Sequence, residues 1–250
     1  MKMTFGDDAS EACDRVWSWI GRHPWPGWRI EVVRADEDPS HMQWGEPPRL
    51  RPASPPPGRS VDGLDADGVE FFEANADPRA LLAQSTSDLV VVGLKDRGHL
   101  QAALVGSTAE WLLHHPPSPL ALVRRSGRVR RVLVCADGSV HSQRAVDALA
   151  SVPWIGDCTI DVLAVDDGRA DPHAAQSTAE RLATVATSVD SRVRTGSATE
   201  VILDAVRDLA PDLVVMGTRG LTGWPRLRLG STASTVVRSS GCDHLVACVD

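Results

Sequence analysis

Lysine and aromatic residues are scarce in this sequence of 250 residues, which has no tyrosine, three phenylalanines and two lysines. Both lysines, Lys2 and Lys95, lie in the first half. A P-loop and a protein-kinase core each place a lysine on the nucleotide phosphates, so the second half contains neither. No run of 18 apolar residues occurs, and we therefore expect no membrane-spanning helix and no membrane partner.

The sequence also has fewer basic than acidic residues. Its 26 lysines and arginines and 33 aspartates and glutamates give a net charge of −7. The absence of an arginine-rich tail or stripe argues against a nucleic-acid partner. The first residues turn acidic before an apolar segment forms, so we expect no secretion signal. The composition, with 42% hydrophobic residues, is that of a globular protein, and we predict a cytoplasmic location.

Motifs for catalysis and for metal binding are missing as well. The five cysteines never form a C-x-x-C pair and several lie in apolar runs, which favours buried, reduced thiols over a metal site. We find no Ser/His/Asp arrangement, paired-carboxylate motif or nucleophile elbow. The sequence therefore predicts no catalytic residue and no metal-ligand residue.

The sequence contains an internal repeat. Residues 88–93 (DLVVVG) return 124 positions later as residues 212–217 (DLVVMG), and residues 106–109 (GSTA) return at the same offset as residues 230–233. The matched blocks keep their order, which indicates a tandem duplication. We place the boundary near Gly127, which gives one domain at residues 1–126 and a second at residues 127–250.

The second copy alternates strands with helices. We expect strands at 131–136, 159–165, 192–194, 212–216 and 244–249. We expect helices at 142–151, 171–188, 199–209 and 231–239. This alternation predicts an α/β fold, with a five-stranded parallel sheet covered on both faces that binds ligands at the carboxyl ends of its strands.

The first copy keeps this plan but is eroded. Its second strand, 29–34, is intact, whereas a loop at 37–68 with seven prolines replaces the expected second helix. Prolines at this density exclude a helix, and we interpret the loop as a disordered insert or a docking segment. Asp77 and Pro78 then form a cap and first-turn pair that opens a helix to about residue 84.

The motif that carries chemistry, G-x2-G-x9-G-S, follows the fourth strand of the second copy. Gly217 and Gly220 allow a tight turn and let phosphate oxygens approach backbone amides without interference from a Cβ. Gly230 and Ser231 open a helix, whose free amides and dipole favour an anion. A strand, a glycine-rich loop and a helix start in this order predict a phosphate site.

This motif, after a strand that ends in VVMG, resembles the signature of the ATP-binding universal stress proteins. The strand ends at 136–139 (ADGS) and 163–165 (LAV) and the last apolar strand agree with that family. The resemblance covers the second half closely and the first half as a degenerate copy. It implies two tandem Rossmann-like domains of the adenine nucleotide alpha hydrolase-like type.

The resemblance also implies a role for residues of the second copy. Asp137 holds the nucleoside, and the Val165 backbone meets the adenine edge. Arg219 supplies a counter-charge to the triphosphate, and Mg²⁺ is held with ATP through phosphate oxygens and water. The implied ATP-binding residues are Ala136, Asp137, Ser139, Val165, Met216, Gly217, Arg219, Gly220, Gly230, Ser231 and Thr232. The residues alone leave alternatives open, because Asp137 and Ser139 can each cap the next helix and Arg219 can be a solvated loop residue.

The first half lacks part of this site, because Asp96 stands at the position of Gly220. A carboxylate about 5 Å from a phosphate costs roughly 3 kcal/mol per charge pair at an effective dielectric near 20, which is about a hundredfold in affinity. Ala35 takes the place of Val165, and the missing helix removes a wall on the adenine side. We therefore predict one ATP site per chain, in the C-terminal domain.

The predicted function is a stress-response module whose ATP occupancy is sensed by a protein partner. It is not an enzyme, although slow ATP hydrolysis is compatible with the site. The alternatives are an interaction protein with vestigial sites and an adenylating enzyme, but residues 137–139 (DGS) do not match the phosphate motifs of the latter. The resemblance also implies antiparallel pairing of the last strands, 120–123 and 244–249, in a homodimer or between the two halves.

Overall fold

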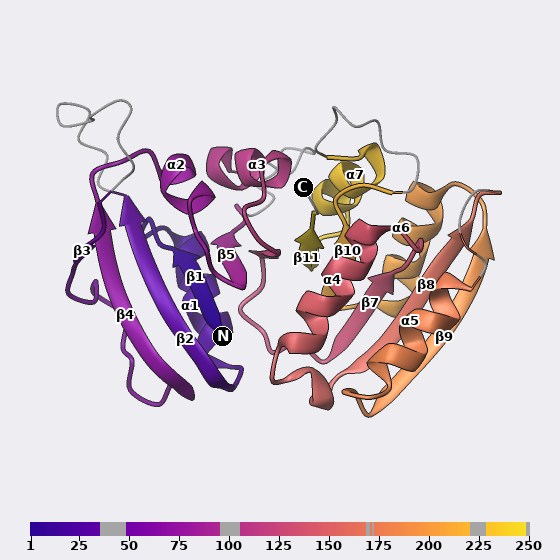
Figure 1. Cartoon of the computed structure of the whole chain (residues 1–250), viewed down its shortest axis with the longest axis horizontal. Helices are drawn as coiled ribbons and strands as arrows, with labels where there is room; N and C mark the ends of the chain where they lie inside the picture. Colours follow the sequence, from indigo (N-terminus) through magenta and orange to yellow (C-terminus); the bar gives the residue numbers. More distant parts are fainter. Residues whose placement is uncertain (36–48, 96–105, 169–170, 172, 221–228, 249–250) are drawn as a thin grey trace. The chain divides into compact units, whose positions relative to one another are not determined.

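The computed structural model describes residues 1–35, 49–95, 106–168, 171, 173–220 and 229–248. The chain divides into two compact units (Figure 1). Of the described residues, the first unit contains 1–95 and 106–127, and the second contains 128–248. Each unit is a mostly parallel sheet with helices, which confirms the predicted α/β class.

The sheet of the first unit has the strand order β3-β4-β2-β1-β5-β6. Neighbouring strands are parallel except for β3 and β4, which are antiparallel. The carboxyl ends of the parallel strands therefore lie along one edge. The strands are β1 (Lys2–Gly6), β2 (Trp25–Ala35), β3 (Arg51–Pro52), β4 (Ala66–Ala74), β5 (Leu89–Gly93) and β6 (Leu120–Val123).

The helices of the first unit are α1 (Glu11–Gly21), α2 (Pro78–Ala83) and α3 (Ser107–His114). Asp77 accepts a hydrogen bond from the backbone of Arg79, and Pro78 follows it as the first helical residue, so the predicted cap of α2 is confirmed. Trp19 of α1 packs against Trp25 of β2, with ring centroids 5.6 Å apart. These large buried rings anchor α1 on the sheet.

The segment predicted as a proline-rich loop contains regular structure. β3 pairs with β4, and β4 already begins at Ala66. A disordered insert is therefore wrong for residues 49–68, while residues 37–48 lie outside the described residues. β4 escaped prediction because it lies near the edge of the sheet, where only two of its nine residues are buried and no apolar run forms.

The second unit has the strand order β11-β10-β7-β8-β9, with all pairs parallel. Its strands are β7 (Arg131–Cys135), β8 (Thr159–Asp166), β9 (Ser188–Thr195), β10 (Leu213–Gly217) and β11 (Asp243–Ala247). Its helices are α4 (Val140–Ser151), α5 (Ala174–Leu182), α6 (Ala198–Leu209) and α7 (Ser231–Ser239), with a 3-10 turn at Ile155–Asp157. Every strand and helix predicted for this half is present.

The bounds of α5 and β9 in the second unit were predicted wrongly. The helix expected at 171–188 ends at Leu182, and residue 188 already belongs to β9. β9 also extends well beyond the predicted 192–194. The reason is exposure, since six of the eight residues of this outer strand are exposed and the apolar run that marks a buried strand is absent.

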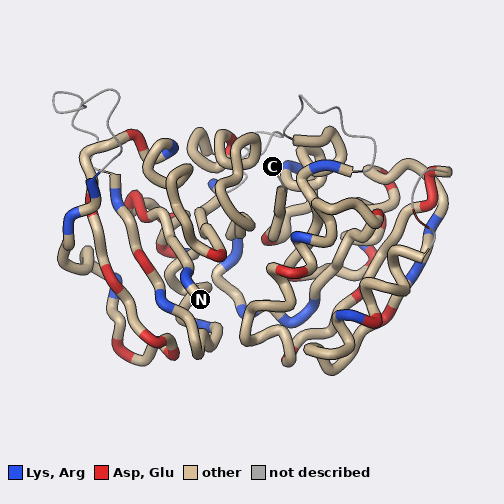
Figure 2. Tube along the Cα trace, in the orientation of Figure 1, with Lys and Arg blue, Asp and Glu red and all other residues tan. Residues whose placement is uncertain are grey.

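Charged residues of both signs are interspersed along both units (Figure 2). Asp161 of β8 is a buried carboxylate of the second unit, and it accepts hydrogen bonds from Arg131 at 3.2 Å and Arg192 at 2.6 Å. These contacts link β7, β8 and β9. In the described part of the chain, no helix has both the length and the apolar character needed to cross a membrane.

Candidate functional site

The predicted site of the second unit lies where β7 and β10 end. These strands are neighbours in the sheet, so the turns that follow them meet. The Asp137 Oδ2 atom lies 2.9 Å from the position that a Cβ would take on Gly220. A side chain at position 220 would displace the carboxylate. The fold thus brings together the residue assigned to the nucleoside and the glycine assigned to the phosphates.

Gly217 ends β10 against the first turn of α4. A Cβ on Gly217 would lie 2.7 Å from the backbone nitrogen of Ser142 and 2.9 Å from the carbonyl carbon of His141. Because these are backbone atoms, any other residue would push α4 away from the strand. Helix packing therefore requires this glycine independently of any phosphate.

The helix α7 begins without a side-chain cap, beside the same loop. Gly230 is the N-cap residue, and its amide donates a hydrogen bond to the carbonyl of Thr218 at 2.7 Å. Ser231 and Thr232 form the first turn, where backbone amides and hydroxyl groups gather at the positive end of the helix dipole. This geometry suits an anion.

Ser139 takes the capping role that the sequence left open between it and Asp137. The Ser139 hydroxyl accepts a hydrogen bond from the Ser142 amide at 3.2 Å and lies 3.4 Å from the carbonyl oxygen of Arg219, to which it donates. The Asp137 Oδ1 atom accepts from the Ser139 amide at 2.9 Å. The other carboxylate oxygen remains beside Gly220.

Arg219 places a positive charge next to this turn. Its Nη2 atom lies 3.2 Å from the Cys248 sulfur. Burial and then the charge of Arg219 hold the pKa of His141 below its ordinary value, although Asp137 acts in the opposite direction. Arg219 and Asp137 therefore both act electrostatically at the start of α4.

The predicted adenine walls are core residues. Ala136, Val165 and Met216 are all buried at the carboxyl ends of β7, β8 and β10. Their contact with adenine stays a prediction. Next to them, burial and then the charge of Asp137 raise the pKa of the Cys135 thiol to about 12, which disfavours the reactive thiolate. The spacer at 221–228, with Trp224, lies outside the described residues.

Sequence reasoning missed Thr218, the first residue after Gly217. Thr218 is fully buried, and its hydroxyl oxygen has no hydrogen-bond partner among the described residues. A buried hydroxyl without a hydrogen bond lowers the stability of the folded chain, so the loop contains a polar group whose hydrogen bonds are not satisfied. The motif treats this position as variable, so no sequence pattern points to it.

The first unit repeats the turn of the second. The Asp8 Oδ1 atom accepts a hydrogen bond from the Ser10 amide at 3.0 Å, as Asp137 does from Ser139. Ser10 caps α1. Between them, Ala9 has φ +59° where the second unit has Gly138 at φ +80°. The duplicated turn therefore persists, although alanine replaces the glycine.

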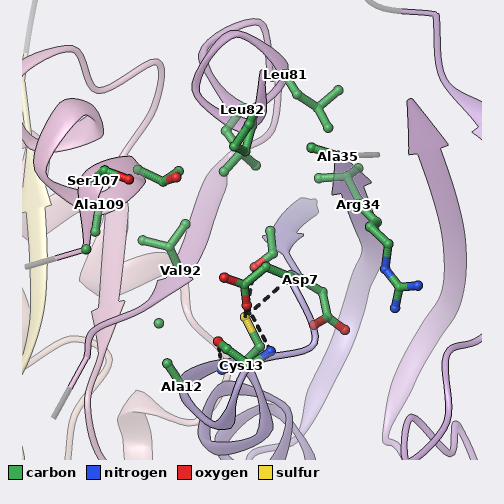
Figure 3. Close-up of a pocket in the computed structure, with 18 of the residues that line it drawn as sticks. Asp7, Ala12, Cys13, Arg34, Ala35, Leu81, Leu82, Val92, Ser107 and Ala109 are labelled. Carbon is green, nitrogen blue, oxygen red and sulfur yellow. Dashed lines mark hydrogen bonds between the residues drawn. The ribbon is translucent and has the colours of Figure 1, made fainter. Parts of the chain in front are cut away.

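The first unit has a cavity of about 450 Å³ at the carboxyl ends of β1, β2 and β5. Figure 3 shows Leu81 and Leu82 of α2 on one side and Ser107 of α3 on another. α2, the helix predicted from Asp77 and Pro78, thus forms one wall of the cavity, while the described residues between β2 and β4 contain no helix, as predicted. Lys95 also lines the cavity, with its Cε 3.7 Å from the position of a Cβ on Gly106. Asp96, on which the predicted repulsion depends, lies outside the described residues.

Asp7, one residue before Asp8, forms a buried ion pair with the proline-rich segment. Its carboxylate accepts from Arg59 at 2.7 and 3.1 Å, and Arg59 also donates to Asp14 at 2.6 Å. Burial acts to lower the pKa of Arg59, but the two carboxylates raise it overall. The segment is thus tied to the sheet beside the cavity.

Asp7, Asp8 and Cys13 hold their potential metal-ligating atoms within 4.8 Å of one another. Two features disfavour a metal there. Arg59 already engages both oxygens of Asp7. Burial, with the nearby charges of Asp8 and Asp7, also raises the pKa of Cys13 to about 12, whereas metals bind the thiolate. Asp7 instead belongs to the ion pair with Arg59, and the Cys13 thiol donates a hydrogen bond to Asp8 at 3.1 Å.

Comparison with known proteins points in one direction. The model of the universal stress protein family matches residues 76–124 and 128–247. Universal stress protein Slr1230 of Synechocystis sp. is 27% identical over 163 residues, which cover 61% of this chain and 55% of that protein. A putative universal stress protein of Staphylococcus epidermidis is 27% identical over 137 residues, 47% of this chain and 82% of that protein. The chain thus spans about half the length of the first of these relatives.

A solved structure resembles the chain over nearly all its length. The crystal structure of a universal stress protein from Archaeoglobus fulgidus superposes with a TM-score of 0.68 over 98% of this chain and 97% of the other. The two sequences are 18% identical, so this likeness concerns the fold alone.

Proposed function

We propose that this chain, which belongs to the universal stress protein family, binds ATP in its second unit and signals the occupancy of that site to a protein partner in the cytoplasm. One observation carries the proposal, namely that three parts of the predicted site lie together. Asp137 lies against Gly220 of the glycine-rich loop. The same loop is joined to the uncapped start of α7 by the hydrogen bond from Gly230 to Thr218. A nucleoside acceptor and a phosphate cradle thus lie at one edge of the sheet.

The chemistry of the site suits a triphosphate with its cation. Amides at the start of α7 and in the loop donate to phosphate oxygens, and Arg219 balances their charge. Asp137 accepts a hydrogen bond from a nucleoside hydroxyl. Residues 217–220 and 229–232 contain no carboxylate, so Mg²⁺ fits this site when phosphate oxygens and water supply its ligands.

We further propose that the site works by binding and not by turnover. Besides Arg219 and the Cys135 thiol, the described residues of the site offer Asp137 and His141 as titratable groups, and Asp137 already accepts a hydrogen bond from the Ser139 amide. Slow ATP hydrolysis is compatible with this arrangement. A turnover above about 1 s⁻¹ would contradict it, because such rates are ordinary for enzymes.

Isothermal titration with ATP tests the proposal through a matched pair of variants. Gly230→Asp places a carboxylate at the start of α7, and we expect roughly a hundredfold loss of affinity. Gly106→Asp makes the same change at the start of α3 and should leave the affinity unchanged. The proposal fails if Gly106→Asp weakens ATP as much as Gly230→Asp does, or if the wild type binds no ATP.

The cavity of the first unit favours a second candidate, in which both units bind a nucleotide. It is lined by Asp8, Lys95 and the uncapped start of α3, the counterparts of Asp137, Arg219 and the start of α7. The same titration separates the candidates by stoichiometry. One ATP per chain supports the single site, and two equivalent ATP molecules support the second candidate.

A further inference from the structure

β9 is the outer strand of the second unit and pairs along its whole length with β8. In the first unit, the outer edge of β4 is covered by β3, whose Pro52 has no amide hydrogen to offer a further strand. No strand among the described residues covers β9 in this way (Figure 1). Val193, in the middle of this open edge, is 51% exposed.

The hydrogen-bond alternation of β9 shows which backbone groups face outward. The amide of Gly196, just after β9, donates to the carbonyl of Asp166 at 3.3 Å. In a parallel ladder, alternate residues bond to the same neighbouring strand, so the even-numbered residues of β9 bond to β8. Val189, Ser191 and Val193 therefore turn their amide and carbonyl groups away from the sheet.

The side chains of β9 separate by the same alternation. The Ser191 hydroxyl donates to Gln176 of α5 at 3.1 Å, so the odd-numbered side chains share the face of α5. The even-numbered side chains carry the charges, and Arg192 donates to Asp161 through one nitrogen only. Asp190 is exposed and forms no ion pair within the described part of the chain.

We infer that β9 pairs antiparallel with β9 of a second copy of this chain, about a two-fold axis at Ser191. In this register Ser191 lies opposite Ser191, Val189 opposite Val193, and Asp190 opposite Arg192, each of the last two pairs occurring twice. The outward amide and carbonyl groups then bond to each other, and the exposed Val193 of each copy packs against Val189 of the other.

Charge selects this register over its neighbours. The two strands can also pair in a register shifted so that the outward amide and carbonyl groups still face each other. The two-fold axis then passes through Asp190 or through Arg192. The first shift places Asp190 opposite Asp190, and the second places Arg192 opposite Arg192. Like charges directly opposite are destabilising in a sheet, whereas opposite charges stabilise it. Of the three registers, the one centred on Ser191 alone has no like-charged pair.

Disulfide cross-linking tests the register directly. Residues directly opposite in a hydrogen-bonded pair have Cα atoms about 5.5 Å apart, which is within the span of a disulfide. Oxidised Ser191→Cys should therefore form a covalent dimer. Ser188→Cys is the matched control on the same strand, since the two copies of residue 188 would lie roughly 20 Å apart. Equal cross-linking of both variants would overturn the proposal.

Analytical ultracentrifugation tests the charge pairs without any added cysteine. Asp190→Arg replaces two attractive pairs with two repulsive ones, and we expect the dimer dissociation constant to rise roughly tenfold or more. Asp62→Arg, an exposed charge reversal in the first unit, should leave it unchanged. A wild-type chain that stays monomeric at about 1 mM, or a dimer indifferent to Asp190→Arg, overturns the proposal.

Discussion

The turn after the first strand has a similar backbone in both units, but the residue that precedes its aspartate differs. In the second unit, Ala136 precedes Asp137, whose carboxylate faces the glycine-rich loop. In the first unit, Asp7 takes the place of Ala136 and binds Arg59 from the proline-rich segment. Both units thus keep this turn, while an aspartate at the position of an alanine adds a structural ion pair beside it in the first unit.

The largest expected effect comes from breaking the ion pair that only the first unit has. Arg59→Met leaves the buried Asp7 carboxylate with a hydrogen bond from the Ala9 amide at 2.8 Å but without the positive charge that balances it, and we expect a loss of about 3–5 kcal/mol in the free energy of unfolding. Urea denaturation followed by tryptophan fluorescence measures it, because α1 and β2 of this unit are rich in tryptophan.

Arg192→Met in the second unit is the control for that prediction. Asp161 keeps its second partner, Arg131, and Arg192 is 40% exposed, so the loss should be clearly smaller. Equal losses in the free energy of unfolding for the two variants would contradict the role of Arg59 as the partner that balances the charge of Asp7.

The next effect concerns a feature that the units share. A Cβ on Gly93 would lie 2.9 Å from the Ala12 backbone, just as one on Gly217 would meet the α4 backbone at 2.7 Å. Gly93→Ala and Gly217→Ala should each lower stability by about 1–3 kcal/mol. Thermal unfolding measures both, with Gly127→Ala, where a Cβ meets nothing within 4 Å, as control. A loss in only one unit would contradict the common packing.

A smaller effect has opposite sign in the two units. Ala9 holds a left-handed conformation at φ +59°, so Ala9→Gly should raise stability by up to about 1 kcal/mol. Gly138→Ala imposes the same strain on the second unit and should lower stability by about 1 kcal/mol or more, since its Cβ would also approach Asp171 at 3.2 Å. Denaturant titration of both variants measures the change in the free energy of unfolding. Changes of the same sign would contradict the equivalence of the two turns.

The smallest expected effect is on pH dependence. Because the pKa of His141 is lowered in the folded chain, the unfolded chain takes up the proton first as the pH falls below 6.5. Stability from neutral His141 is therefore complete above that pH and declines towards the lower folded pKa. His141→Gln should flatten the pH dependence of the unfolding midpoint in this range. An unchanged profile would contradict this. Ala12 at the matching position gives the first unit no such dependence.

The sequence predicted buried elements well and exposed ones poorly. Parallel strands such as β7 and β10 are covered on both faces and therefore appear as apolar runs. β4 and most of β9 lie at sheet edges and mix polar with apolar residues, so their bounds carried no comparable signal.

The candidate site divides in the same way. Glycine spacing predicted Gly217 and Gly220, because local turn geometry determines them, and the family resemblance implied Asp137. The Arg59–Asp7 pair joins residues 52 positions apart, and no spacing rule links them. The orphan hydroxyl of Thr218 likewise depends on packing that only coordinates reveal.

The anchoring of Arg59 has a consequence for anyone who trims or recombines this chain. The proline-rich segment looks like an appendage that a shorter version can lose, yet its removal strands a negative charge inside the protein at Asp7. A truncated chain also needs an uncharged residue at position 7, for example the alanine that the second unit has at the matching position 136. A full-length variant without Arg59 therefore needs an uncharged residue at position 7 as well.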